Sequence, residues 1–258
     1  MKILKEVWEY RNMIGNLVKK DLTGRYKGSV LGFLWTLINP LFQLIIYSVL
    51  FSIILPNRVD NYAIFLFVAL VPWLFCSTSV LIGSECIMQN SGLVQKIYFP
   101  RIVLPIITVT SNFINMLLTF IIVFAALFIT GVGISVTALL LPLVMIVEYL
   151  FVLGLVLLFS SLTVYFRDLS YILGIVMMGW MYLTPVLYPI DQVQGALLQG
   201  FMNVNPMAGI VGSYRDILFY KTLPNFGQLG IIALASIVII VIGFVVFQKL
   251  QKRFAEEL

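Results

Sequence analysis

The sequence predicts an all-α integral membrane protein with six transmembrane helices, and three observations support this fold class. Of the 258 residues, 61% are hydrophobic and only 10% are charged, whereas a soluble domain carries about 25% charged residues. The mean hydropathy is +1.06. Uncharged stretches long enough to cross a bilayer recur along the whole chain, so we expect one membrane domain and not a soluble domain with an anchor.

Charged residues and one glycine-rich turn mark the breaks between the predicted spans. The uncharged stretch between Arg101 and Glu148 is too long for one helix and is interrupted by TGVG at residues 130–133, so it holds two helices. A spanning helix needs about 20 apolar residues. We therefore place six spans, at residues 31–54, 62–84, 103–130, 137–164, 170–189 and 229–248.

Residues 192–214 are also uncharged, but they are rich in Gln, Asn and Gly and are not convincingly apolar. We expect them to form an outer re-entrant or interfacial segment before the last span. Non-helical backbone at membrane depth is tolerated only against protein or a water-filled cavity. Pro185 and Pro189 precede this segment and are expected to end the fifth span.

The distribution of positive charge predicts the orientation. Thirteen of the 16 Lys and Arg residues fall on the side that holds both predicted termini, and only Arg58, Arg215 and Lys221 fall on the other side. Positively charged loops stay in the cytoplasm. The protein is therefore predicted to lie in the cytoplasmic (inner) membrane as a multi-pass protein with both termini cytoplasmic.

We divide the single transmembrane domain, residues 1–258, into an N-terminal interfacial helix (1–28), a six-span core (29–248) and a cytoplasmic tail (249–258). In the first part, apolar residues recur every three or four positions with Lys and Glu between them. This pattern is typical of an amphipathic helix in the headgroup plane. The alternative is a positive flank that only orients the first span, and no signal peptide is predicted.

The segment after the second span is longer than a turn requires. Residues 87–97 are expected to form a short helix that Pro100 stops, and Arg101 then opens the third span. A helix presented on the cytoplasmic face suits a partner protein. The alternative is a frayed extension of the two adjacent spans.

The sequence holds no motif for catalysis or nucleotide binding. It lacks the phosphate-binding pattern G-x-x-x-x-G-K-[ST], and it contains no histidine and no metal-ligand cluster. We therefore expect no catalytic residue, no metal site, no bound cofactor and no enzymatic activity of the chain on its own. Cys76 and Cys86 are expected to be small buried thiols.

Glu148 lies alone inside the fourth predicted span, where a carboxyl group is costly and is a functional candidate by default. Two interpretations stay open: a structural hydrogen bond to a helix bearing Ser, Thr or Asn, and a place in the lining of a transport pathway. The aromatic residues within or near the spans allow either ordinary helix packing or a channel whose rings stack on sugar faces. These channel-lining candidates are Trp35, Tyr47, Trp180 and Tyr182.

A charged pair, Arg167 and Asp168, stands at the start of the fifth predicted span. We expect this charged junction to contact water, headgroups or a partner, and Asp168 to interact favourably with the helix dipole. The alternative is a simple anchor at the membrane surface.

Five stretches, taken in order and spacing, carry a resemblance to a known family. They are RYKGSVLGFLWTLINPL (25–41), VPWLFCSTSV (71–80), NSGLVQKIYFPRIVLPI (90–106), VYFRDLSYIL (164–173) with LTPVLYP (183–189), and NPMAGIVGSYRDILF (205–219). Over nearly its whole length, the chain resembles the membrane (permease) subunit of ABC exporters of lipid-linked polysaccharides. This family includes O-antigen, capsule and teichoic acid exporters.

The resemblance implies a transmembrane subunit of an ATP-driven exporter that moves a lipid-linked polysaccharide across the cytoplasmic membrane. It implies that two copies of the chain form a homodimer. The implied partners are two copies of a separate cytoplasmic ABC ATPase that uses ATP and Mg, a polyprenyl-linked glycan and membrane lipids. No nucleic acid is expected. The route would run between the two copies, lined mainly by the first and fifth spans.

The resemblance also implies two groups of site residues. Coupling to the ATPase would involve Asn90, Leu93, Val94, Lys96, Ile97 and Tyr98. The headgroup or pyrophosphate of the glycan carrier would have three basic candidates, Lys20, Arg25 and Lys27, although lipid phosphates attract the same residues.

Other classes of protein stay open at this point. A drug or lipid ABC exporter permease would share the architecture. An ion-coupled secondary carrier would need inverted repeats and more buried acids, and the sequence shows neither. A structural membrane scaffold would leave the cytoplasmic coupling segment unexplained.

Overall fold

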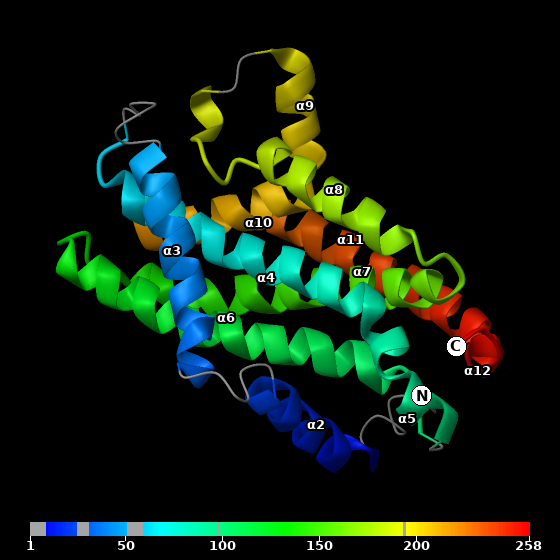
Figure 1. Cartoon of the computed structure of the whole chain (residues 1–258). Coiled ribbons are helices and arrows are strands. Elements are labelled where there is room, and N and C mark those ends of the chain that lie inside the picture. The colour runs from blue at the N-terminus through cyan, green and yellow to red at the C-terminus, as the bar shows by residue number, and fades with distance from the viewer. Residues whose placement is uncertain (1–8, 25–30, 51–58, 97–98, 193–194) are drawn as a thin grey trace.

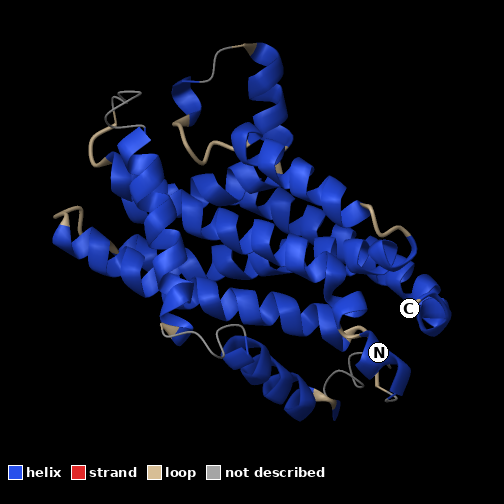
Figure 2. Ribbon diagram, viewed as in Figure 1, coloured by secondary structure: helices blue, strands red, loops and turns tan. Residues whose placement is uncertain are grey.

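The computed structural model describes residues 9–24, 31–50, 59–96, 99–192 and 195–258. All regular structure in these ranges is helical (Figure 2). The all-α fold class is thereby confirmed for the described part of the chain.

Four helices in the described residues are long and apolar enough to cross a membrane. At about 1.5 Å per residue, 25 or more residues exceed the roughly 30 Å hydrocarbon core. They correspond to the second, third, fourth and sixth predicted spans. They are α4 (Tyr62–Gln89), α6 (Val103–Ile129), α7 (Leu141–Tyr165) and α11 (Phe226–Leu250).

The first and fifth predicted spans coincide with two shorter apolar helices, α3 (Trp35–Val49) and α8 (Leu169–Leu183), of 15 residues each. Each is about 22 Å long. The α8 helix ends earlier than predicted because Thr184 adopts an extended backbone conformation ahead of Pro185, as the residue before a proline prefers. Residues 51–58, where the first span was expected to end, lie outside the described residues.

The α4 helix is the centre of the fold. Nearly all of its circumference is buried, and it packs against both α6 and α7. By contrast, α11 packs mainly on α7 and is the most apolar and least buried of the four long helices. The exposed apolar side chains of such a helix suit a lipid environment, because their exposure to water is unfavourable.

Two glycines allow α7 and α11 to approach closely. A Cβ atom added at Gly243 would lie 2.6 Å from the backbone oxygen of Gly154 and 3.1 Å from the backbone nitrogen of Leu158. A Cβ atom added at Gly154 would lie 2.8 Å from the backbone nitrogen of Ile240. Small residues at such crossings let membrane helices gain van der Waals contact along their backbones.

The predicted re-entrant segment folds into two short helices, α9 (Ala196–Val204) and α10 (Pro206–Arg215). Asn205 separates them: its side chain accepts a hydrogen bond from the backbone nitrogen of Met207 and so caps α10, and Pro206 occupies the first helical position. The α10 helix is largely buried and packs against α4.

The described chain starts, just before α2, at the same end of the helix bundle as α5 (Ser91–Lys96) and the C-terminal helix α12 (Phe254–Glu257) (Figure 1). We call this the α5 end and the opposite one the α9 end. At the α5 end, α2 (Arg11–Gly24) packs against α6 and buries Val18. The predicted N-terminal helix is therefore present over part of residues 1–28, and residues 1–8 and 25–28 lie outside the described ranges.

Cys76 and Cys86 are buried free thiols, which confirms that prediction. The predicted cytoplasmic tail is packed against the bundle. Phe254 is fully buried, and Arg101, at the start of α6, donates a hydrogen bond to the backbone oxygen of Gln251. The tail and the segment around α5 therefore form one packed unit with the core.

Replacing Gly243 with Ala should destabilise the protein, because the new methyl group meets fixed backbone of α7 and not a movable side chain. We expect a loss of about 1–3 kcal/mol, typical of overpacking. Gly230→Ala is the matched control, since a Cβ atom there has no neighbour within 4 Å on the same helix. Thermal unfolding of both variants in detergent checks this, and equal midpoints would contradict the close approach.

Candidate functional site

A buried arginine organises the α9 end. Arg215 is 4% exposed. Its Nε donates to the backbone oxygen of Phe65 (3.3 Å), Nη2 donates to that of Val186 (2.6 Å), and Nη1 donates to those of Pro185 and Tyr188. The guanidinium carbon also lies 3.5 Å from the centre of the Phe65 ring, in a cation–π arrangement.

Three of these bonds satisfy backbone carbonyl groups in residues 185–188, which lie outside the α-helices and lack the hydrogen bonds of a helix. Tyr62 donates its hydroxyl to the backbone oxygen of Leu187 (2.7 Å). Together with Arg215 it therefore bonds every carbonyl from Pro185 to Tyr188. The sequence placed Arg215 among the loop charges of the outer side, whereas the structure buries it as a structural donor.

Asn205 extends this network to α8. Trp180 donates its indole Nε1–H to Oδ1 of Asn205 (3.0 Å), and Nδ2 of Asn205 donates to the backbone oxygen of Leu183 (3.2 Å) and to the hydroxyl of Thr184 (3.0 Å). The Trp180 ring also makes an edge contact with Trp73 of α4. Trp180 therefore joins the last turn of α8 to the rest of the protein.

Glu148 is fully buried in α7 and accepts a hydrogen bond from the hydroxyl of Tyr214 on α10 (2.7 Å). The expected bond to a neighbouring helix is present, but its donor is a tyrosine and not Ser, Thr or Asn. The Tyr214 ring stacks on Phe120 of α6 at 5.4 Å. This contact links three helices within the core.

The four aromatic channel candidates differ in how far their side chains are exposed. Trp35 and Tyr47 on α3 are half-buried, and Trp180 is held by Asn205. Tyr182 on α8 is 59% exposed.

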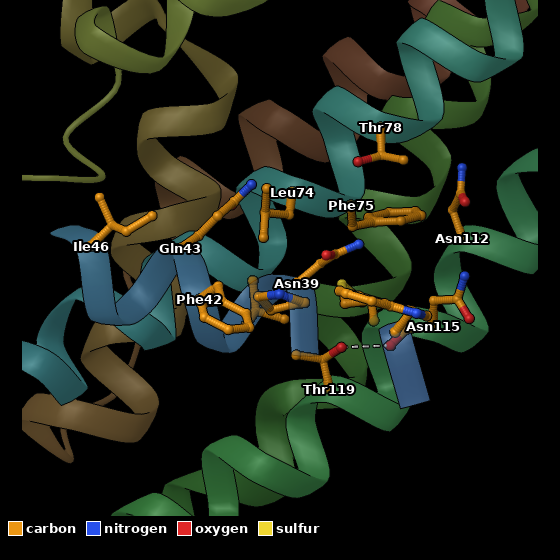
Figure 3. A pocket seen from close by; sticks show the side chains of 14 residues that line it. Asn39, Phe42, Gln43, Ile46, Leu74, Phe75, Thr78, Asn112, Asn115 and Thr119 are labelled. Atoms are coloured by element: carbon orange, nitrogen blue, oxygen red, sulfur yellow. Dashed lines mark hydrogen bonds between the residues drawn. The ribbon is translucent and has the colours of Figure 1, made fainter. Parts of the chain in front are cut away.

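A polar pocket lies between α3, α4 and α6, and Figure 3 shows its side chains. Its volume is about 350 Å³. Asn39 and Gln43 extend from α3, and Asn112, Asn115 and Thr119 come from α6. We call this cavity the amide pocket, because four side-chain amides meet in it.

The rest of the lining is apolar or weakly polar. Trp35 and Phe42 of α3 and Phe75 of α4 supply aromatic rings, and Thr78 of α4 adds a hydroxyl. None of the described residues that line the amide pocket is charged. The Oδ1 atom of Asn115 is buried and has no hydrogen-bond partner among the described residues.

A second pocket, of about 370 Å³, lies at the α5 end between α2, α5 and α6. Its lining includes Lys20 of α2, the headgroup candidate, together with Asn90 and Leu93, two of the coupling candidates. Residues assigned to two different tasks from the sequence therefore share one cavity. Asp21 also lines it, so the cavity carries both signs of charge.

The coupling candidates occupy different environments. Val94 is buried in a hydrophobic cluster with Val18, Ile87 and Val103, whereas Lys96 is exposed. Asn90 ends α4, where its Nδ2 donates to the backbone oxygen of Cys86 (2.8 Å). The α5 helix is thus anchored on one face and open on the other.

The two residues of the predicted charged junction lie at the surface. Arg167 and Asp168 are exposed between α7 and α8, and neither forms an ion pair within the ranges the structure describes. Asp168 starts α8, but its side chain does not cap the helix. The remaining candidates lie outside the described residues; they are Arg25, Lys27, Ile97 and Tyr98.

The amide pocket was not predicted from the sequence, although part of its pattern is visible there. In the third span, Thr108, Asn112, Asn115 and Thr119 recur at three- and four-residue steps, which places them on one face of a helix. A polar stripe within an uncharged span predicts contact with protein or a cavity. The amides of α3 that complete the pocket could not be matched to this stripe without the fold.

The long apolar helices define the chain as a multi-pass helical membrane protein. The short helix α5 is packed against one end of its bundle. A family model described as ABC-2 type transporter matches residues 13–219. An O-antigen export system permease protein RfbA from Myxococcus xanthus is 32% identical over 259 residues, covering all of both chains. A protein of the same name from Klebsiella pneumoniae is 32% identical over 241 residues, covering 93% of this chain and 92% of the relative.

The chain therefore belongs to the ABC-2 type transporter family. It is a permease subunit, and the ATPase of such a transporter is a separate chain. This agrees with the absence of a phosphate-binding loop from the sequence.

Replacing Arg215 with Met should destabilise the protein strongly, because several buried carbonyl groups lose their donor at once. We expect a loss of about 3 kcal/mol or more, since bonds from charged donors are worth about 1.5–3 kcal/mol each. Lys252→Met, which removes an exposed cation, is the control. Thermal unfolding in detergent measures both, and similar stability of the two variants would contradict a structural role for Arg215.

Proposed function

We propose that this chain is the transmembrane subunit of an ATP-driven exporter of a lipid-linked polysaccharide of the O-antigen, capsule or teichoic acid type. The observation that carries the proposal is the full-length similarity to O-antigen export system permeases. The uncharged amide pocket and the exposed aromatic side chain of Tyr182 support a carbohydrate cargo. The membrane would be the inner membrane, with both termini in the cytoplasm.

A six-span topology is part of this proposal. The start of α2 and the end of α12 lie at one end of the bundle, which requires an even number of crossings between them (Figure 1). The four long helices together with α3 and α8 make six. The two shorter helices would cross with the help of residues beyond their ends, or by local thinning of the bilayer.

A homodimer would place the route between two copies, lined mainly by α3 and α8. The support is the unpartnered apolar surface of both helices in the single chain. Val49 on α3 is 46% exposed, and Ile175 and Met178 on α8 are 69% and 64% exposed. A homodimer interface tends to be more apolar than the rest of the surface.

The α5 helix is the proposed contact for the two cytoplasmic ATPase subunits. Its exposed face, with Lys96, would meet the ATPase, and its buried face, with Val94, would pass movement to α2 and α6 through their shared hydrophobic cluster. Lys20 lies in the cavity beside α5, where it would meet the pyrophosphate of the polyprenyl-linked glycan. The cargo would then bind at Lys20, next to the helix α5 that the ATPase moves.

Reconstitution in vesicles tests this function. The permease together with its ATPase should move lipid-linked glycan in the presence of ATP and Mg, and the permease alone should move none, because the chain has no nucleotide site. Glycan movement is measured by accessibility to an impermeant glycosidase. Gradient-driven transport without the ATPase would instead support a secondary carrier, and export restricted to drugs or lipids would support the related exporter class.

Arg167→Ala should reduce export without reducing membrane insertion, because Arg167 is exposed at the junction of α7 and α8 and packs no core. We expect a several-fold loss of surface glycan, measured against the amount of permease in the membrane. Arg253→Ala, which also removes an exposed arginine at the α5 end, is the control. Normal export by the Arg167 variant would contradict this role and would show that Arg167 only anchors the chain at the membrane surface.

A further inference from the structure

We propose that the amide pocket binds one neutral, hydroxyl-rich sugar unit of the exported glycan. This inference rests on the proposed function and deepens it, because it gives the cargo a defined subsite within one protomer. The subsite lies between α3, α4 and α6, and not on the outer face of α3 or α8.

The chemistry of the lining selects this ligand. Each side-chain amide offers an acceptor oxygen and two N–H donors, and hydroxyl groups on a sugar ring can satisfy both. Asn39 and Gln43 supply such groups from one wall, and Asn115 supplies them from the opposite wall. The buried Oδ1 of Asn115, which has no partner among the described residues, is an acceptor that a sugar hydroxyl would bond.

The apolar side of the pocket suits the same ligand. The rings of Trp35 and Phe75 face the cavity beside the amides. The C–H face of a sugar packs on such rings, while its hydroxyls reach the polar wall. A volume of about 350 Å³ lies at the lower end of the range for small-molecule sites, so the pocket holds a short part of a chain and not a long one.

Other occupants fit less well. An acyl or polyprenyl chain offers no hydrogen-bond donor, so it would leave the buried Oδ1 atom of Asn115 without a partner, which is costly. A phosphate group would find no Lys or Arg among the described residues that line the pocket. The lipid part and the pyrophosphate of the cargo are therefore expected elsewhere.

A thiol-protection experiment on the full permease–ATPase complex tests the assignment. Both native cysteines are buried, and Gln43 is exposed on α3, so Gln43→Cys adds one reactive thiol at the pocket without disturbing the core. The matched control is Ile45→Cys, on the same helix and 56% exposed but outside the pocket. The probes are the lipid-linked glycan extracted from the host membrane and polyprenyl phosphate without sugar.

We expect the intact glycan to slow alkylation of Cys at position 43 by a neutral maleimide several-fold, and polyprenyl phosphate to leave it unchanged. Alkylation at position 45 should not respond to either probe. Equal protection by polyprenyl phosphate would show a lipid site and overturn the proposal. Equal protection at both positions would show that the glycan covers the face of α3, and would overturn it as well.

A binding measurement complements the protection experiment. Asn39→Leu should weaken binding of the extracted glycan about tenfold, the effect of losing roughly one good hydrogen bond. Thr110→Val is the control, because Thr110 lies on α6 but its hydroxyl meets Tyr149 and not the pocket. Unchanged glycan affinity of a normally folded Asn39 variant would overturn the assignment.

The two proposals fail in different ways. If the wild-type complex binds no lipid-linked glycan, the proposed function fails and the sugar subsite fails with it. If the wild-type complex binds the glycan but position 43 is not protected, only the sugar subsite is wrong.

Discussion

The side chain of Arg215 stabilises the part of the fold where the chain leaves its helices. A backbone that is irregular in or near lipid must have its carbonyl groups bonded within the protein. From Pro185 to Tyr188 this is done by side chains, three times by Arg215 and once by Tyr62. Because these donors come from α10 and α4, the chain can stop α8 early and turn back toward the core.

The same helix that supplies Tyr62 also connects the other functional regions. Along α4, Phe65 contacts Arg215, Leu74 and Thr78 line the amide pocket, and Asn90 ends the helix beside α5. Under the proposed coupling, a movement imposed on α5 would reach the amide pocket through one continuous and deeply buried helix. Such a packed element transmits displacement because cores are close-packed and deform little.

The sequence was sufficient for the features that depend on local hydrophobicity. Four of the predicted spans coincide, within a few residues, with helices that are long and apolar enough to cross a membrane, because a long apolar stretch has few alternatives in a bilayer. It was insufficient where distant residues meet. Arg215 resembles an ordinary loop cation until residues 185–188 are brought to it, and Tyr214 cannot be recognised as the partner of Glu148 without the packing of α10 on α7.

The helices differ in how firmly they are held, and this difference bears on mechanism. The α7 and α11 helices meet through the backbones of Gly154 and Gly243, and α4 is buried on nearly all sides. The α3 and α8 helices are shorter and keep large apolar side chains exposed, as Ile46 and Ile175 illustrate. Movement of α3 against the firm core would change the width of the amide pocket, since α3 forms one wall and α4 and α6 form the others. Opening of a route and release of a bound sugar would then be the same motion.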